Sequence, residues 1–347
     1  MLSSAQQYAA NWKESFSMLM RQLEQQTEPH IANTKKELIY RENKLRLFRY
    51  QPLNIQQVKT PILLCYALIN RPDIVDLQDD RSLVLRLLEK GHPVYLIDWG
   101  YPDSTDCFTS LDDYINGLLH RCIQRTKRDA ACEQVDLLGI CQGGVFSLCY
   151  AALHPKQIRK LITIVTPVDC HYPGSRLSLW PQSVDEEMLS ETTTNIPGQQ
   201  LSSLFNALKP FQLSHEKYRQ PSNLVYNKKK LLTFLRMEKW LNDTPDLAGL
   251  AAREFFHYFY QHNCLQNNSL QLGKQTVSLT KIKCPVLNFY ASKDHIVPPA
   301  STQALRQHID KYLYQEKALH GGHIGAFTSK ETQHILINTL TDWLNQS

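Results

Sequence analysis

The sequence lacks a long apolar run, a block of like charge and a regular cysteine pattern. Its 38 basic and 33 acidic side chains are spread over 347 residues, so no basic arm for nucleic acid stands out. No apolar run reaches the roughly 18 residues that a membrane span needs. Nine cysteines at irregular spacing, without a CxxC pair, disfavour a disulfide framework or a zinc module. We therefore expect a cytoplasmic protein without a membrane span, a metal site or a nucleic-acid partner.

The first residues show no sign of an export signal. The amphipathic sequence from Met1 has neither a basic start, an apolar centre nor a small-residue cleavage site. Residues 1–45 are rich in Gln, Glu, Lys and Arg and carry Leu and Met at helical spacing. This stretch is predicted to be an N-terminal helical segment on the outside of the main domain.

Short apolar runs and helical stretches alternate through residues 46–168 and again through 276–347. The apolar runs, typical of strands buried on both faces, cover 62–69, 94–97, 135–140, 161–165 and 285–290. Such alternation predicts an α/β fold, a mostly parallel central sheet with helices on both faces. Residues 169–275 lose this pattern and contain helical stretches, which predicts an inserted, mainly helical lid.

A glycine-flanked cysteine follows the third of these strands. The sequence from Leu138 to Gly144 reads LGICQGG, so Cys141 stands in a G-x-C-x-G pattern between a strand and a helix. This pattern indicates a nucleophile elbow, in which glycines permit a tight turn that exposes the residue at its tip. A helix N-terminus and a nearby imidazole both favour a thiolate, so Cys141 is the candidate nucleophile. Without this context, a cysteine is most often a small buried side chain.

Two later residues complete a catalytic set in a meaningful chain order. Asp294 follows the apolar run at 285–290, and His323 lies in the glycine-rich loop before the last helix. Nucleophile, acid and histidine occur in this order in α/β-hydrolases, and the long interval between Cys141 and Asp294 suits an inserted lid. On its own Asp294 is also compatible with a turn aspartate, and His320 stays as an alternative to His323.

A site for acyl transfer also needs backbone N–H groups that stabilise an oxyanion. In this fold one comes from the residue after the nucleophile, here Gln142, and one from the loop after an early strand. Either Ile69 or Asn70 would supply the second N–H, and the sequence leaves this choice open.

Several motifs together resemble the polyhydroxyalkanoate synthases, and in particular their class III catalytic subunit. They are ALINRP at 67–72, YLIDWGYPD at 95–103, LGICQGG at 138–144 and GGHIG at 321–325, with NIPG at 195–198, LKPF at 208–211 and MEKW at 237–240 in the expected lid. One departure lies at 324–327, where an aromatic residue is expected sooner after the glycine.

The resemblance implies an acyltransferase that needs no cofactor, because its substrate is a coenzyme A thioester. Cys141 would accept an (R)-3-hydroxyacyl group, with 3-hydroxybutyryl as the expected unit, and the hydroxyl of a second unit would then attack to lengthen a polyester. Asp294 would help to activate that hydroxyl. The motifs place four further residues near the substrate path: Trp99, Tyr101, Trp240 and His295. The resemblance also implies a homodimer, a distinct helper subunit and a location on cytoplasmic polyester granules.

Two other functions are compatible with the same residues. A thioesterase or polyester depolymerase would differ only in letting water attack the intermediate, although the cysteine and the lid motifs favour synthesis. A non-catalytic granule-associated subunit would keep the fold without the chemistry. The intact set of Cys141, Asp294 and His323 disfavours this second alternative.

Overall fold

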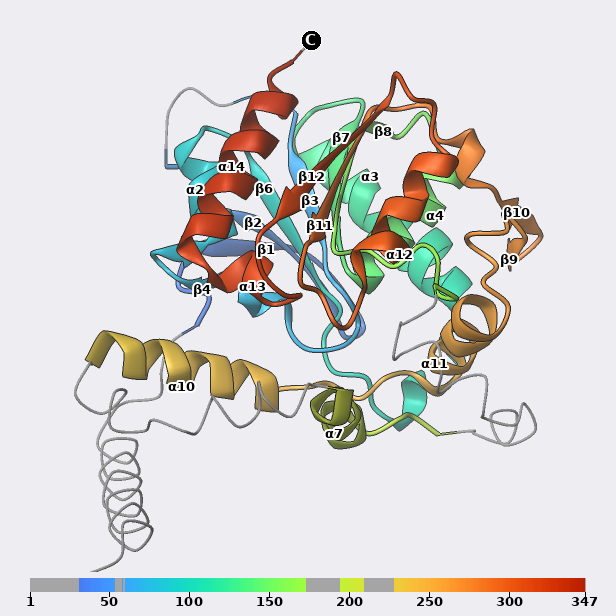
Figure 1. The fold of residues 1–347 in the computed structure, drawn as a ribbon, viewed down its shortest axis with the longest axis horizontal. Helices are drawn as coiled ribbons and strands as arrows, with labels where there is room; N and C mark the ends of the chain where they lie inside the picture. Colours follow the sequence, from blue (N-terminus) through green and yellow to red (C-terminus); the bar gives the residue numbers. More distant parts are fainter. Residues whose placement is uncertain (1–30, 54–57, 59, 173–193, 209–227, 347) are drawn as a thin grey trace, which may run out of the picture.

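The computed structural model describes residues 31–53, 58, 60–172, 194–208 and 228–346 of the chain. Its centre is an eight-stranded sheet (Figure 1). The strands lie in the order β1 (Lys36–Glu42), β2 (Leu45–Tyr50), β6 (Val94–Asp98), β3 (Ile62–Cys65), β7 (Val135–Ile140), β8 (Ile158–Ile164), β11 (Val286–Ala291) and β12 (Tyr314–Leu319). Neighbours from β6 to β12 are parallel, whereas β2 is antiparallel to both β1 and β6. The predicted α/β class with a mostly parallel sheet is confirmed.

The central strands are buried on both faces, which explains their continuous apolar runs. Successive side chains alternate between two cores, so that Leu63 on β3 belongs to one core and Leu64 to the other. The helices α3 (His120–Asp129) and α4 (Gln142–Leu153) contribute to the first core, and α2 (Leu83–Glu89) and α14 (Lys330–Leu344) contribute to the second (Figure 1). Helices therefore cover both faces, as predicted.

Short elements complete the core. They are η1 (Pro72–Val75), η2 (Ser104–Asp106), η6 (Leu279–Lys281), η7 (Ala304–Gln307), α12 (Pro299–Gln303), α13 (Gly325–Thr328), the strand pair β4 (Asp76–Gln78) and β5 (Arg81–Ser82), and the strand pair β9 (Leu270–Leu272) and β10 (Gln275–Val277). A π-helical segment, η3 (Asp113–Leu119), leads into α3. The helical residues 111–112 that lead into η3 follow Ser110, whose side-chain oxygen accepts from the N–H of Asp113 at 3.1 Å and whose own N–H donates to the Asp113 carboxylate at 2.9 Å.

The prediction of an N-terminal helical segment over residues 1–45 is wrong at the C-terminal end of that range. Residues 1–30 lie outside the described residues, and Lys36–Glu42 forms β1 rather than a helix. The turn at Asn43 and Lys44 joins β1 to β2, and Asn43 has a φ of +50°, which Asn tolerates better than most residues. This turn pairs Glu42 with Leu45, so the chain enters the sheet before the expected boundary at residue 46.

The described part of the expected lid, residues 169–275, is mainly helical. It contains α7 (Gly198–Leu208), α10 (Lys228–Asn242), α11 (Gly249–Phe255) and the π-helical segment η5 (Phe256–Gln261). α7 and α10 lie beside the edge of the sheet at which the parallel strands end (Figure 1). The division into a core of 46–168 and 276–347 and a lid of 169–275 stays a prediction.

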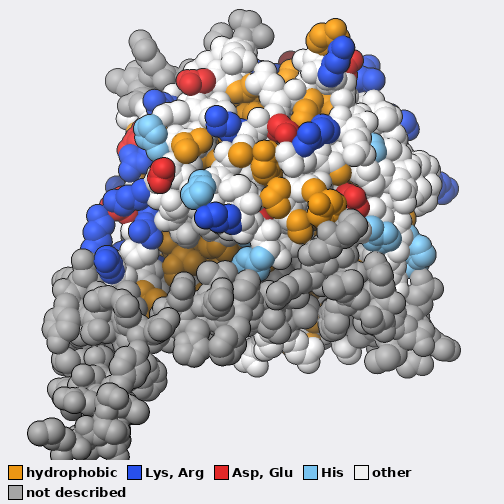
Figure 2. Space-filling view, in the orientation of Figure 1, with side chains coloured by type: hydrophobic (Ala, Val, Ile, Leu, Met, Phe, Trp, Pro, Cys, Tyr) orange, Lys and Arg blue, Asp and Glu red, His pale blue; other side chains and the backbone are white. Residues whose placement is uncertain are grey.

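Three further properties concern the side chains at the surface, the hydropathy of the helices and the state of the cysteines. Figure 2 shows basic, acidic and hydrophobic side chains interspersed over the described part of one face. Among the described residues, no helix combines the length and the hydropathy that crossing a membrane requires. All nine cysteines are free thiols.

Candidate active site

Cys141 stands at a sharp turn between β7 and α4, as the elbow pattern predicts. Its φ of 54° and ψ of −121° lie outside the regions usual for a residue with a side chain. The N–H of Cys141 donates to the Ile164 carbonyl at 2.9 Å, and the Cys141 carbonyl accepts from the N–H of Gly144 at 2.9 Å. Strand and helix therefore hold the strained residue from both sides, with its side chain beyond the end of the strand.

Glycines follow Cys141 because neighbouring atoms approach the backbone closely. A Cβ on Gly143 would collide with the Cys65 carbonyl and lie 2.6 Å from the carbonyl carbon of Tyr66. A Cβ on Gly144 would collide with the hydroxyl of Thr166 and lie 2.8 Å from its Cγ2. The glycines thus let α4 begin directly against β3 and the end of β8, which is what a nucleophile elbow requires.

His323 and Asp294 meet beside Cys141. Nδ1 of His323 lies 2.7 Å from Oδ2 of Asp294, and both side chains are buried. The second carboxylate oxygen, Oδ1, accepts from the backbone N–H groups of Ile296 and Val297 at 2.9 Å each. Cys141 and His323 line the same cavity. The turn after β11 therefore fixes the carboxylate, and the carboxylate orients the imidazole toward the thiol.

Opposing effects set the protonation of His323. Burial by itself lowers the pKa of the imidazole, but the charges of Asp294 and Cys141, with the hydrogen bond to Asp294, raise the pKa well above its usual value. An imidazolium in this position stabilises a cysteine thiolate. The arrangement can therefore activate a thiol for attack on an acyl group and return a proton to a leaving group.

The loop after β3, residues 67–72, lies against the elbow, and we call it the β3 loop. Oε1 of Gln142, the first residue of α4, accepts a buried hydrogen bond from the N–H of Leu68 at 2.9 Å. Ile69 and Asn70, the two candidates for the second oxyanion N–H, both line the cavity that contains Cys141. The structure therefore brings both predicted sources of N–H groups to the thiol and leaves the choice between Ile69 and Asn70 open.

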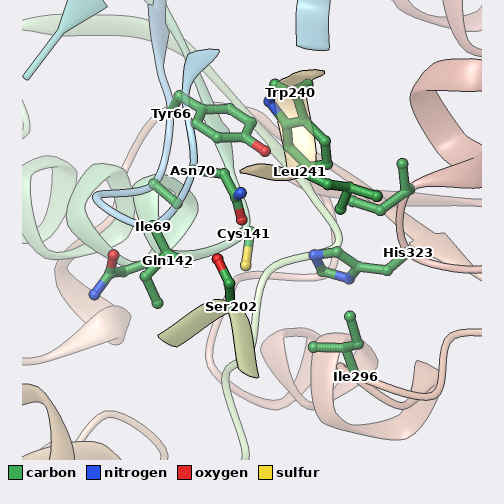
Figure 3. Close-up of a pocket in the computed structure, with 12 residues that line it drawn as sticks. Tyr66, Ile69, Asn70, Cys141, Gln142, Ser202, Trp240, Leu241, Ile296 and His323 are labelled. Carbon is green, nitrogen blue, oxygen red and sulfur yellow. The ribbon is translucent and has the colours of Figure 1, made fainter. Parts of the chain in front are cut away.

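A cavity of about 100 Å³ opens beside Cys141 (Figure 3). Its lining residues come from the loops around the sheet and from α7 and α10: Tyr66, Ala67, Ile69, Asn70, Cys141, Gln142, Ser202, Trp240, Leu241, Ile296, His323 and Ile324. Trp240 on α10 is one of the residues expected near the substrate path, and its Nε1 donates to the Arg71 carbonyl at 2.7 Å. Residues of α7 and α10 therefore form part of the wall around the thiol.

Trp99, expected near the substrate path, is a core residue instead. It is 7% exposed, and its ring lies edge-on to those of Tyr114 and Phe146, with centroid distances of 5.5 Å and 6.2 Å. Its Nε1 donates to the Tyr66 carbonyl at 2.9 Å. Trp99 therefore reaches the cavity wall through the backbone of Tyr66. Its position after a strand end did not indicate that its ring packs in the core.

Three other predicted residues also lie outside the lining of this cavity. Tyr101 is 48% exposed, and its hydroxyl donates to Asp243 at 2.8 Å. His295 is half-buried directly after Asp294. His320, the alternative catalytic histidine, is exposed, which leaves His323 as the histidine that bonds the acid.

Six lining residues were not predicted: Tyr66, Ala67, Ser202, Leu241, Ile296 and Ile324. Five of them are close in sequence to predicted site residues, so nearness to the β3 loop, to Trp240, to Asp294 or to His323 was the available signal. Ser202 belongs to α7 and reaches the cavity only because this helix lies against the core. Helical periodicity does not reveal such an arrangement.

The chemically active groups of the site are one thiol, one imidazole and one carboxylate. Within the described ranges, no three His, Cys, Asp or Glu side chains come together in a group that could hold a metal ion. The imidazole and the carboxylate of the site are bonded to each other. This set matches the nucleophile, base and orienting acid of acyl transfer.

Two protein-family models match the chain. The model described as alpha/beta hydrolase fold matches residues 60–330, which include Cys141, Asp294 and His323. The model described as Poly-beta-hydroxybutyrate polymerase (PhaC) N-terminus matches residues 11–87, which include β1, β2 and the β3 loop. Together the two matches extend over most of the chain.

Curated relatives are similar over most of the chain. The poly(3-hydroxyalkanoate) polymerase subunit PhaC of Thiocystis violacea is 46% identical over 312 residues, which cover 90% of this chain and 88% of the relative. The subunit of the same name from Synechocystis sp. is 42% identical over 323 residues, which cover 91% of this chain and 85% of the relative.

Solved structures of low sequence identity share the fold. A thermophilic esterase from Thermogutta terrifontis has a TM-score of 0.53 at 15% identity, with 89% of this chain and 98% of that chain covered. The enol-lactonase from Burkholderia xenovorans LB400 has a TM-score of 0.51 at 14% identity, with 88% and 98% covered. With the family model, these similarities confirm the predicted α/β-hydrolase fold.

Proposed function

Because this chain belongs to the poly(3-hydroxyalkanoate) polymerases, which are acyltransferases, we propose that it polymerises (R)-3-hydroxyacyl-CoA through a thioester on Cys141. The expected unit is 3-hydroxybutyryl, as the family resemblance implies. Coenzyme A enters as part of the substrate, so the reaction needs no cofactor. The observation that carries the proposal is the 2.7 Å contact between His323 Nδ1 and Asp294 Oδ2 beside Cys141.

The first half-reaction transfers the acyl group from coenzyme A to the enzyme. His323 takes the proton of the Cys141 thiol, and the resulting thiolate attacks the thioester carbonyl. The N–H of Gln142, with that of Ile69 or Asn70, stabilises the oxyanion. When the carbon–sulfur bond to coenzyme A breaks, the leaving thiolate takes the proton from His323.

The second half-reaction forms the ester bond. The hydroxyl of another hydroxyacyl unit gives its proton to His323, aided by Asp294, and its oxygen attacks the Cys141 thioester. The bond between the acyl carbon and Sγ breaks, and the proton on His323 returns to the departing thiolate. Water in place of the hydroxyl would release a free acid, and the apolar side chains of the lining support synthesis because they disfavour water.

We further propose that the enzyme is a homodimer that works with a distinct helper subunit on cytoplasmic polyester granules. The names of the relatives support a partner subunit, because they describe a polymerase subunit. The product supports the location, since an apolar polyester separates from water. The homodimer rests on the family resemblance alone.

The test is release of free coenzyme A from (R)-3-hydroxybutyryl-CoA by the purified protein, wild type beside Cys141→Ala. We expect coenzyme A and insoluble polyester from the wild type and neither from the variant. Free acid in place of polymer would identify a thioesterase or depolymerase. Release that persists in Cys141→Ala would exclude Cys141 as nucleophile, and no release from the wild type would indicate a required helper subunit or a non-catalytic role.

A further inference from the structure

Two polar side chains from different parts of the fold lie beside Cys141 and are joined by a third. Asn70, in the β3 loop, and Ser202, on α7, both line the cavity (Figure 3). Nδ2 of Asn70 donates to the Thr244 hydroxyl oxygen at 2.9 Å, and the Ser202 hydroxyl donates to the same oxygen at 2.8 Å. Thr244, which follows α10, therefore links the core to the lid at the cavity wall.

These hydrogen bonds determine which polar groups are left for a ligand. The Thr244 oxygen accepts from Asn70 and Ser202 and donates its own proton to the Leu241 carbonyl at 3.4 Å. The hydroxyl proton of Ser202 and one amide proton of Asn70 are thus used inside the network. This leaves the lone pairs of Ser202 Oγ and of Asn70 Oδ1 as acceptors at the cavity, and the second amide proton of Asn70 as a donor.

The remaining lining of the cavity is largely apolar. Aliphatic side chains come from Ala67, Ile69, Leu241, Ile296 and Ile324. The side-chain oxygen of Gln142 already accepts from Leu68, and His323 is bonded to Asp294. Asn70 and Ser202 are therefore well placed to bind a donor group on a ligand attached to Cys141.

We propose that Asn70 and Ser202 bind the 3-hydroxyl of the acyl unit on Cys141 and so select hydroxyacyl thioesters over plain acyl and 3-oxoacyl thioesters. This inference rests on the proposed function. A 3-hydroxyl can both donate to one of the two acceptors and accept the second amide proton of Asn70, a 3-oxo group can only accept that proton, and a saturated chain does neither. A site built to bind a hydroxyl rejects analogues without it, because its own polar groups are then left unpaired.

The test is single-turnover acylation of Cys141, followed by mass spectrometry of the intact protein. Each protein is mixed with the coenzyme A thioesters of (R)-3-hydroxybutyrate, butyrate and 3-oxobutyrate. We expect the wild type to acylate fastest with the hydroxybutyryl thioester. In Ser202→Ala and in Asn70→Gly, the ratio of the hydroxybutyryl rate to the butyryl rate should fall about 3- to 10-fold, as expected for one lost hydrogen bond.

Matched variants separate hydrogen bonding from structure. Glycine is the replacement at position 70 because Asn70 has a φ of +60°, where a larger side chain adds strain. Thr244 acts through its two partners and is a positioning residue. Thr244→Val removes the shared acceptor and should lower the hydroxybutyryl preference, whereas Thr244→Ser keeps the hydroxyl and should retain the preference.

The outcomes that contradict the inference differ from those that contradict the proposed function. A wild type that acylates equally fast with all three thioesters would overturn the inference, and so would a rate ratio that is unchanged in both Ser202→Ala and Asn70→Gly. Absence of any adduct on Cys141 with every thioester would overturn the proposed function and the inference together.

Discussion

Arg71 and Asp98 form a buried, two-point ion pair between the β3 loop and the end of β6. Nη1 of Arg71 lies 2.6 Å from Oδ1 of Asp98, and Nη2 lies 2.6 Å from Oδ2. The two residues are 6% and 4% exposed. Arg46 on β2 adds a contact of 2.7 Å to Oδ2. The pair joins the motifs ALINRP and YLIDWGYPD, and it therefore holds the loop that carries Ile69 and Asn70.

We predict that Asp98→Asn lowers the free energy of unfolding by about 3–5 kcal/mol, because the buried guanidinium of Arg71 loses the nearer of its two counter-charges and keeps only Asp73 at 3.6 Å. Burial alone raises the pKa of Asp98, but the hydrogen bond and charge of Arg71 outweigh it and lower the pKa. A carboxyl whose pKa is lowered by folding stabilises the folded protein at pH values above its unfolded pKa of about 3.9. This stabilisation is lost as the pH falls through the folded pKa. Denaturant unfolding at about pH 7 and pH 3 should show that the difference in unfolding free energy between wild type and variant is smaller at the lower pH.

The control for this prediction is Glu37→Gln. Glu37 forms an exposed pair with Arg49 at 2.8 Å, so its loss should cost less than about 1 kcal/mol. Equal destabilisation by Asp98→Asn and Glu37→Gln would contradict a structural role specific to the buried pair.

We predict that Gln142→Leu lowers kcat for coenzyme A release more than it raises KM. The change removes the acceptor of the buried Leu68 N–H, and an unpaired buried donor costs about 1–3 kcal/mol. The β3 loop would lose its bond to the elbow, so the second oxyanion N–H would lose its fixed position. Steady-state kinetics measure the effect, and Gln142→Glu, which keeps an oxygen acceptor, should lose less. An unchanged kcat in Gln142→Leu would show that the oxyanion site does not depend on this bond.

We predict that Gly144→Ala destabilises the protein and that Thr166→Ala relieves part of the loss. The new Cβ would collide with the Thr166 hydroxyl and lie 2.8 Å from its Cγ2, and alanine at 166 removes both atoms. Overpacking of this kind costs about 1–3 kcal/mol. A double-mutant cycle of unfolding free energies measures the relief. Gly143→Ala is the control, because its Cβ meets backbone atoms of Cys65 and Tyr66, so Thr166→Ala should give it no relief.

The catalytic set could be predicted because each of its members follows a strand in a fixed order. Cys141 follows β7, Asp294 follows β11 and His323 follows β12. Parallel strands bring their carboxyl ends to one edge of the sheet, so the three loops converge whatever the length of an insertion between them. The elbow glycines added a local signal that only a very tight turn explains.

The cavity wall and the N-terminal hairpin could not be predicted, because they depend on contacts between distant segments. Ser202 reaches the cavity through α7, and it meets Asn70 only through Thr244. The strand β1 lies at the sheet edge with Leu38 47% exposed, so its sequence has no clean alternation that separates an edge strand from a helix.

We predict that Asp294→Asn lowers the pKa of His323. The substitution keeps an Oδ1 that can accept from Ile296 and Val297, and it removes the charge that raises the pKa of the imidazole. Burial then has the larger effect, so the ring should titrate at lower pH than in the wild type. NMR titration of the His323 ring protons measures the change. Cys141→Ala, which removes the weaker of the two charges, should lower the pKa by less.

The same substitution should change stability in a pH-dependent way. A histidine whose pKa is raised by folding contributes stability that is fully present below its unfolded pKa of about 6.5 and is lost as pH rises through the folded pKa. Near pH 6, the free energy of unfolding of the wild type should therefore exceed that of Asp294→Asn by about 1–3 kcal/mol. This difference should narrow as the pH rises above the folded pKa of His323. If His323 titrated at the same pH in both proteins, the carboxylate would orient the imidazole without setting its charge, and His323 would act on Cys141 as a neutral base.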